Sequence, residues 1–220
     1  MLTKENLARI EKWNNDPNST INQYLAEPIV KGQIVFYGPS NFTRWSTKYG
    51  MTPLREALLG KSGNPCCINR GFGTSASEEH LYYYHSLVRP LEPKVLVYAP
   101  GIGNGLTAGF TAQQLFESAQ RVVLYAQTDF PDIRIYILGL PLQRDLMFKG
   151  TVKPMYVEYD NWLREFAEKT PNCTYLTLNS YTPIHRNDIY VEDHVHFNQE
   201  GYKLYADFFR EVLKEELDQY

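Results

Sequence analysis

Cysteine is scarce in this chain of 220 residues, which has three: Cys66, Cys67 and Cys173. Adjacent cysteines rarely pair with each other, and an odd number of cysteines in a chain of this length is typical of reduced thiols. We therefore expect a cytoplasmic location, where thiols stay reduced.

Long apolar runs are absent as well. No stretch approaches the roughly 20 apolar residues that a membrane-spanning helix needs, so we expect no membrane span. Residues 1–15 are charged and lack the apolar segment of a signal peptide. The formal net charge of −3 gives no reason to expect nucleic acid or an anionic membrane as a partner. No group of residues has the spacing of metal ligands, so we expect no metal site.

The composition and length of the sequence indicate a folded chain. Hydrophobic residues make up 43% and charged residues 21%, which is typical of a globular core rather than of disorder. At this length one domain is expected, so we assign residues 1–220 to a single domain. Residues 1–29 precede the first strand, and their two short helical patterns, at 6–14 and 21–25, predict a helical lead-in.

Apolar runs and helical patterns alternate along the rest of the chain. Buried strands are predicted at 34–37, 95–99, 133–138 and 174–178, with a weaker one at 66–69. Helices are predicted at 75–88, 111–128, 156–169 and 198–217, the first two opening with the capping patterns Ser75-x-x-Glu78 and Thr111-x-x-Gln114. Apolar strands that each precede a helix favour a three-layer α/β/α sandwich of the flavodoxin-like kind, with a five-stranded parallel sheet.

Three residues suited to nucleophilic catalysis lie in the connections between these strands and helices. Ser40 comes after the first strand, at a predicted strand-to-helix turn, and Asp193 and His196 lie three apart before the last helix. A serine hydroxyl needs a base to take its proton, and the base needs an acid that orients its ring. Chain order does not restrict such a triad, because geometry defines it. We therefore expect these three side chains to converge.

An ester-cleaving serine also needs donors for the oxyanion of its tetrahedral intermediate. Backbone N–H groups are available at the Ser40 turn and in the turn at 71–74, and Asn104 in the turn at 101–105 has a side-chain amide. All three turns follow strands. In a parallel sheet they meet at the carboxyl edge, where ligands bind.

The same residues resemble the blocks of the SGNH/GDSL hydrolase family. The resemblance runs from about residue 34 to the C-terminus and rests on these segments in family order: Ile34-Val35-Phe36-Tyr37-Gly38-Pro39-Ser40, Asn69-Arg70-Gly71-Phe72-Gly73-Thr74, Val95-Leu96-Val97-Tyr98 with Asn104, and Asp193-x-x-His196 with Asn198 and Gly201-Tyr202.

This resemblance implies roles for particular residues. Ser40 would be the nucleophile, His196 the base and Asp193 the orienting acid. The oxyanion hole would be formed by the N–H groups of Ser40 and Thr74 and the side chain of Asn104. The resemblance also implies an esterase or acylhydrolase that acts on a small-molecule ester or thioester, with no metal and no cofactor.

The chain departs from the family pattern at three positions. Pro39 stands where the family usually has aspartate, Thr74 where it has the glycine that gives an oxyanion N–H, and Gly105 where it has aspartate after the asparagine. These substitutions motivate an alternative, a hydrolase-like fold that has lost useful activity and acts as a binding module. A second alternative is the dinucleotide fingerprint Gly-x-Gly-x-x-Ala at 103–108, although it follows the third strand rather than the first.

Overall fold

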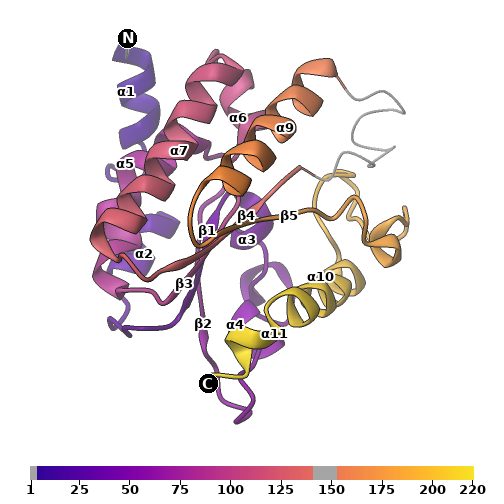
Figure 1. Cartoon of the computed structure of the whole chain (residues 1–220). Coiled ribbons are helices and arrows are strands. Elements are labelled where there is room, and N and C mark those ends of the chain that lie inside the picture. The colour runs from indigo at the N-terminus through magenta and orange to yellow at the C-terminus, as the bar shows by residue number, and fades with distance from the viewer. Residues whose placement is uncertain (1–3, 141–152) are drawn as a thin grey trace.

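A five-stranded parallel sheet forms the centre of the computed structural model, which describes residues 4–140 and 153–220 (Figure 1). The strands are β1 (Ile34–Gly38), β2 (Cys67–Gly71), β3 (Val95–Tyr98), β4 (Arg134–Leu138) and β5 (Cys173–Leu176). Their order is β2-β1-β3-β4-β5, and each neighbouring pair is parallel. The predicted fold class, a flavodoxin-like α/β sandwich with a five-stranded parallel sheet, is therefore confirmed.

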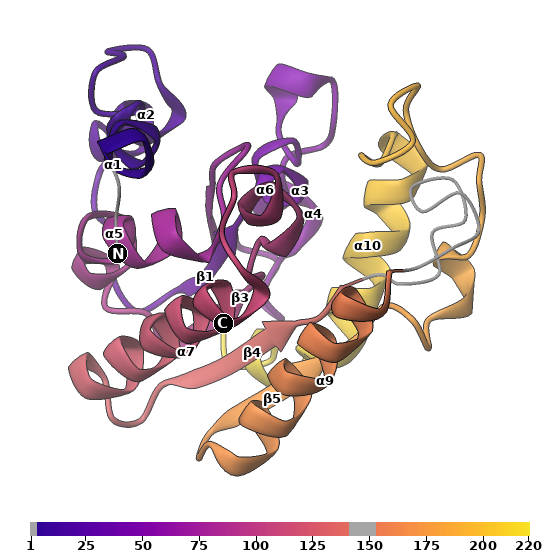
Figure 2. The same ribbon diagram turned by 90° about the horizontal axis from the view of Figure 1, so that it is seen from above.

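Helices cover both faces of this sheet (Figure 2). They are α1 (Lys4–Glu11), α2 (Thr20–Leu25), α3 (Ser40–Thr43), α4 (Leu54–Ala57), α5 (Ser77–Leu87), α6 (Ile102–Thr107), α7 (Ala112–Asp129), α9 (Pro154–Lys169), α10 (Gln199–Val212) and α11 (Lys214–Leu217), with short 3-10 helices η1 (Thr47–Tyr49), η2 (Arg89–Leu91) and η3 (Thr182–Ile184). None of the helices in the described ranges is long and apolar enough to cross a membrane.

The two central strands β1 and β3 are buried along their whole length because each face of the sheet packs against its own layer of helices. Val35 and Tyr37 of β1 belong to the core on the α5, α7 and α9 side. Ile34 and Phe36 of the same strand belong to the core on the α10 side. Since side chains alternate along a strand, a continuous apolar run is what a sheet buried on both faces requires.

Of the two predicted capping boxes, the structure contains the one at α7 but not the one at α5. In α7 the predicted capping box is present, since Thr111 Oγ1 accepts from Gln114 N–H and Gln114 Oε1 accepts from Thr111 N–H. In α5 the predicted Ser75-x-x-Glu78 box is wrong. The carboxylate that accepts from the cap N–H is that of Glu79, bound to Ala76 N–H at 2.7 Å, because the helix begins two residues after Ser75.

Two further segments differ from the prediction. The predicted turn at 101–105 is mostly the helix α6, and the predicted single helix at 198–217 is divided into α10 and α11. Asn198 is the N-cap of α10, where its Oδ1 accepts from Gly201 N–H.

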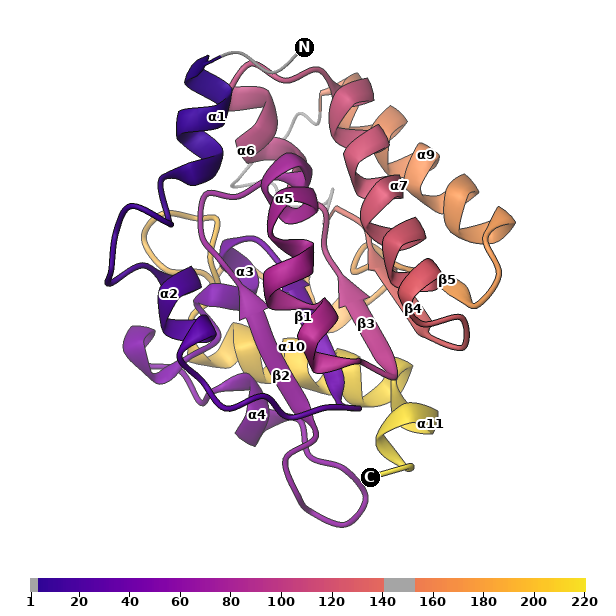
Figure 3. The ribbon, with the colours of Figure 1, turned by 90° about the vertical axis from the view of Figure 1, so that its left-hand side faces the viewer.

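Glycines let the chain segments at the carboxyl edge of the sheet approach closely. A Cβ on Gly71 would lie 2.4 Å from Phe42 Cβ, so only glycine allows β2 to end against α3. A Cβ on Gly101 would lie 2.6 Å from the Ser75 carbonyl oxygen. The ends of β1, β2 and β3 are thereby packed together, and Figure 3 shows α3, α6 and α1 at this end of the sheet.

Candidate active site

Ser40 lies at the topological switch point of the sheet, where the chain leaves β1 between β2 and β3. It is the first residue of α3, and Pro39 before it has extended backbone. The N–H groups in the first turn of a helix have no partner within the helix. Ser40 therefore has a half-buried hydroxyl, and its backbone N–H has no acceptor within the helix. Both groups lie at the edge of the sheet where ligands bind.

His196 and Asp193 come from the loop before α10, and this loop brings them to Ser40. The Ser40 Oγ lies 2.7 Å from His196 Nε2, and His196 Nδ1 lies 2.7 Å from Asp193 Oδ2. The structure thus brings together the three residues proposed as a triad, although 156 positions separate the serine from the histidine.

The Asp193 carboxylate is held in place by its neighbours. Its Oδ1 accepts hydrogen bonds from the N–H groups of Val195 and His196, each at 2.9 Å. Its Oδ2 accepts from Arg44 Nη1 at 3.0 Å. Burial raises the pKa of Asp193, but the hydrogen bonds from His196 and Val195 outweigh it, and the pKa lies well below its ordinary value. The group is therefore an ionised acceptor for His196 Nδ1–H.

Thr74 lies in the turn after β2, next to the serine. A Cβ built on Gly73 would lie 3.9 Å from Ser40 Cβ, so this turn faces the nucleophile candidate. Thr74 itself has a φ of 58°, in the left-handed region that β-branched residues rarely adopt. Such a backbone conformation costs on the order of 1–3 kcal/mol. Its N–H donates to none of the described residues.

Asn104 lies in α6, the helix that follows β3, and its side chain contacts the same turn after β2. Its Nδ2 donates a hydrogen bond to the Ser75 carbonyl at 2.9 Å. A side-chain amide has two N–H groups, so one remains for a ligand. Its role as an oxyanion donor stays a prediction, and the contact with Ser75 shows that it also fixes the turn.

Buried polar groups hold the turn after β2 through hydrogen bonds with Ser75. His80 is completely buried and lies 2.8 Å from Ser75 Oγ through Nε2 and 3.3 Å from the Tyr98 hydroxyl through Nδ1. The Ser75 hydroxyl donates to the Phe72 carbonyl at 2.6 Å. Burial, and then the charge of Arg9, lower the pKa of His80 to about 3. His80 is therefore neutral and part of the scaffold.

The described residues contain no group of three or more metal-ligating side chains. The dinucleotide fingerprint is not supported, because Gly103 and Gly105 lie inside α6 rather than in a turn before it. Cys66, Cys67 and Cys173 are free thiols, and a cytoplasmic location stays a prediction.

No protein-family model and no curated protein matches this sequence. Solved structures do match over most of the chain. A GDSL-like lipase from Bacteroides thetaiotaomicron has a TM-score of 0.64 and 15% identity, with 95% of this chain and 98% of that chain covered. The psychrotrophic esterase EstA from a Pseudoalteromonas species has a TM-score of 0.63 and 15% identity, covering 84% and 99%. The acetyl xylan esterase AlAXEase has a TM-score of 0.64 and 17% identity, covering 82% and 99%.

The chain has the SGNH/GDSL hydrolase fold. At these identities the likeness is one of fold.

Three cations near the site of this SGNH/GDSL hydrolase fold were not expected from the sequence: Arg44, Arg9 and Lys12. Arg44 is four residues after Ser40, a helical spacing that places both on one side of a turn. Arg9 and Lys12 carried no signal, because only the tertiary structure brings the N-terminal helix to Thr74.

Proposed function

We propose that this protein is a serine esterase or acylhydrolase that cleaves an ester or thioester through an acyl-enzyme at Ser40. One observation carries the proposal: the hydrogen-bonded chain from Ser40 through His196 to Asp193, with both distances at 2.7 Å. The partner is a small-molecule ester, and no step of the reaction requires a cofactor or a metal ion.

The hydrogen bonds assign a tautomer to His196. Because Asp193 is ionised and can only accept, His196 Nδ1 carries the proton and the lone pair of Nε2 faces the Ser40 hydroxyl. Nε2 takes the Ser40 hydroxyl proton as Oγ attacks the substrate carbonyl carbon. The same nitrogen then gives this proton to the alcohol or thiol as the bond to the acyl carbon breaks. The alcohol or thiol departs, and the acyl group stays on Oγ.

Hydrolysis of the acyl-enzyme repeats these steps with water. His196 Nε2 takes a proton from water, the resulting hydroxide attacks the acyl carbon, and Ser40 Oγ leaves with the proton returned by His196. Asp193 stays ionised throughout and stabilises the imidazolium that forms in each half-reaction.

Three donors are proposed for the oxyanion of each tetrahedral intermediate. They are the Ser40 N–H, the Thr74 N–H and the second N–H of the Asn104 side-chain amide. One donor of this kind accounts for about 10²–10³ in rate. Since the negative charge develops only in the transition state, these donors should act on kcat rather than on KM.

The alternative function is a binding module on a catalytically impaired SGNH/GDSL hydrolase fold. Two observations favour it: the strained Thr74 at the position of the family's glycine, and the use of one Asn104 N–H by the Ser75 carbonyl. In that case a ligand would bind at the same edge of the sheet without being cleaved.

Hydrolysis of chromogenic acetyl and butyryl esters tests the proposal. The wild-type protein should turn over at least one of them, and Ser40→Ala should be inactive with an unchanged melting temperature. Ser46→Ala, which removes a hydroxyl six residues away that donates to the Thr43 carbonyl, is the matched control and should stay active. An inactive wild type would favour the binding module, and an active Ser40→Ala variant would eliminate Ser40 as the nucleophile.

A further inference from the structure

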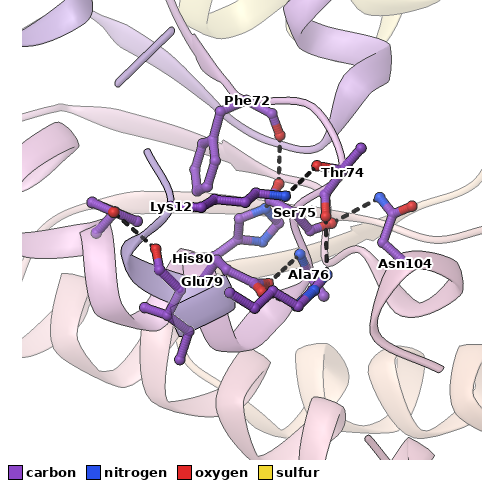
Figure 4. A network of polar contacts seen from close by, with 11 residues as sticks. Lys12, Phe72, Thr74, Ser75, Ala76, Glu79, His80 and Asn104 are labelled. Carbon is purple, nitrogen blue, oxygen red and sulfur yellow. Dashed lines mark hydrogen bonds and ion pairs between the residues drawn. The ribbon is translucent and has the colours of Figure 1, made fainter. Parts of the chain in front are cut away.

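Thr74 occupies a conformation that glycine would adopt more readily. Its φ of 58° is left-handed, and the resemblance places it where related sequences have glycine. A β-branched residue stays in this region only when its surroundings hold it there. Figure 4 shows part of the side chains that surround Thr74.

Two cations from the N-terminal segment contact Thr74 directly. Lys12, the residue after α1, donates from Nζ to Thr74 Oγ1 at 2.8 Å (Figure 4). Arg9 of α1 donates from Nη2 to the Thr74 carbonyl at 3.0 Å. One cation thus fixes the side chain and the other the backbone of the same residue.

The two cations are themselves anchored. Arg9 Nη1 pairs with Glu79 Oε1, and the Glu79 side chain is completely buried. The other oxygen of Glu79 accepts from Ala76 N–H at 2.7 Å, two residues after Thr74. The Lys12 ammonium lies 4.1 Å from the centre of the Trp13 ring, and Trp13 is a core residue. Described residues give Lys12 no carboxylate partner.

The residues on either side of Thr74 are fixed as well. The Ser75 carbonyl accepts from Asn104, and the Ser75 hydroxyl donates to the Phe72 carbonyl. Thr74 is therefore held by its hydroxyl and its carbonyl, while its N–H is used by none of the described residues.

We propose that Arg9 and Lys12 are positioning residues, which hold Thr74 in the left-handed conformation that presents its N–H to the oxyanion. The N-terminal segment thereby performs in this chain the task that glycine's backbone freedom performs in related sequences. This inference rests on the proposed function, because it assigns the Thr74 N–H to the oxyanion hole.

A different role for Lys12 would have other consequences. Lys12 and Arg9 also line a cavity of about 350 Å³ together with Thr74 and Asn104. If Lys12 bound substrate there, its loss would raise KM. A positioning residue acts through Thr74, so its loss should lower kcat at unchanged KM.

A double-mutant cycle tests this directly. Lys12→Met removes the ammonium and keeps an unbranched side chain, and Thr74→Val removes the hydroxyl and keeps the β-branch. Each should lower kcat about tenfold at unchanged KM, the size expected when a hydrogen bond from a charged donor is lost. The double variant should lose no more than either single variant, because both remove the same contact. Effects that multiply, an unchanged kcat, or a raised KM would overturn the proposal.

Glycine at position 74 provides the second arm. Thr74→Gly relieves the backbone strain, so kcat should be retained or rise, and Lys12→Met should then have no further effect. A tenfold loss from Lys12→Met in the glycine background would show that Lys12 does not act through Thr74. Lys169→Met, the same substitution at a side chain that is 75% exposed on α9, is the control and should leave kcat unchanged.

A measurement without substrate separates this proposal from the proposed function. Hydrogen exchange of the peptide that covers residues 71–76 should be faster in Lys12→Met than in the wild type and unchanged in Lys169→Met. Equal exchange in Lys12→Met and the wild type would overturn the positioning role even if the protein hydrolyses esters. Activity that survives Ser40→Ala would instead overturn the proposed function and leave the exchange result standing.

Discussion

Asp193→Asn changes one atom of the site and should change the tautomer of His196. In the wild type, Asp193 Oδ2 accepts from His196 Nδ1 at 2.7 Å, while Oδ1 accepts from two backbone N–H groups. Those two backbone donors require an oxygen, so an asparagine at 193 must place its oxygen there and its NH₂ group toward Nδ1. Nδ1 must then accept, which moves the ring proton to Nε2.

A proton on Nε2 blocks the first step of the reaction, since Nε2 can no longer take the Ser40 proton. Loss of the correct tautomer lowers kcat by about 10⁴ where a triad aspartate is well buried. The Asp193 side chain is 38% exposed, so water can weaken the asparagine's hold on the ring. We therefore expect a loss of about 10³–10⁴, or roughly 4–5.5 kcal/mol of transition-state stabilisation. The loss of the Arg44 ion pair should cost about 1 kcal/mol or less, because both partners are partly exposed.

Steady-state hydrolysis of a chromogenic ester measures this loss, with thermal unfolding as the check on folding. Asp188→Asn is the matched control: Asp188 lies in the same loop, is 69% exposed and pairs with Arg186. It should keep wild-type kcat. An Asp193→Asn protein that folds normally and stays within tenfold of wild-type kcat would refute the tautomer argument and with it the assigned role of Asp193.

Three further results are expected. Asn104→Ala should lower kcat by about 10²–10³ with little change in KM; an unchanged kcat in a protein that hydrolyses esters would remove Asn104 from the oxyanion hole. The pKa of His80 falls from 6.5 to about 3 on folding, so between these pH values the unfolded chain binds more protons than the folded one. The free energy of unfolding should therefore drop as the pH falls below about 6.5, by about 2 kcal/mol at pH 5. Urea unfolding at pH 7 and pH 5 should show this drop reduced by a similar amount in His80→Gln, and an equal drop in both proteins would contradict it. Gly101→Ala should cost about 1–3 kcal/mol of stability and lower kcat, since its Cβ would lie 2.6 Å from the Ser75 carbonyl oxygen. Gly103→Ala should leave stability unchanged or raise it by up to about 1 kcal/mol, because its Cβ meets only Tyr156 Oη at 3.9 Å and alanine is the better helix former. Equal melting temperatures for the two variants would show that the contact between Gly101 and Ser75 does not restrict side-chain size.

The fold followed from the sequence because its signals are local. The central strands are short apolar runs, and runs without alternation are typical of a parallel sheet with helices on both faces. The strand order places β1 beside β3, so Ser40 and the segment of Asn104, which follow these two strands, lie at one edge of the sheet. The meeting of Ser40 with His196 was expected from chemistry, and the structure has the two atoms at hydrogen-bonding distance.

Features that depend on packing did not follow from the sequence. Three glycines within 101–105 predicted a turn, but Gly105 lies against Leu115, where a Cβ would come within 2.4 Å of the leucine side chain. This close packing of α6 on α7 stabilises a helix that intrinsic propensity disfavours. The contacts of Arg9 and Lys12 with Thr74 join residues more than 60 positions apart, and no local pattern marks them.

Covalent labelling shows most directly whether Ser40 is a nucleophile activated by His196. The protein is incubated with a fluorophosphonate, and the adduct is located by peptide mass spectrometry. We expect one adduct, on the peptide that contains Ser40, with no adduct in Ser40→Ala and much slower labelling in His196→Gln. A folded wild-type protein that stays unlabelled, or that is labelled at another residue, would contradict it.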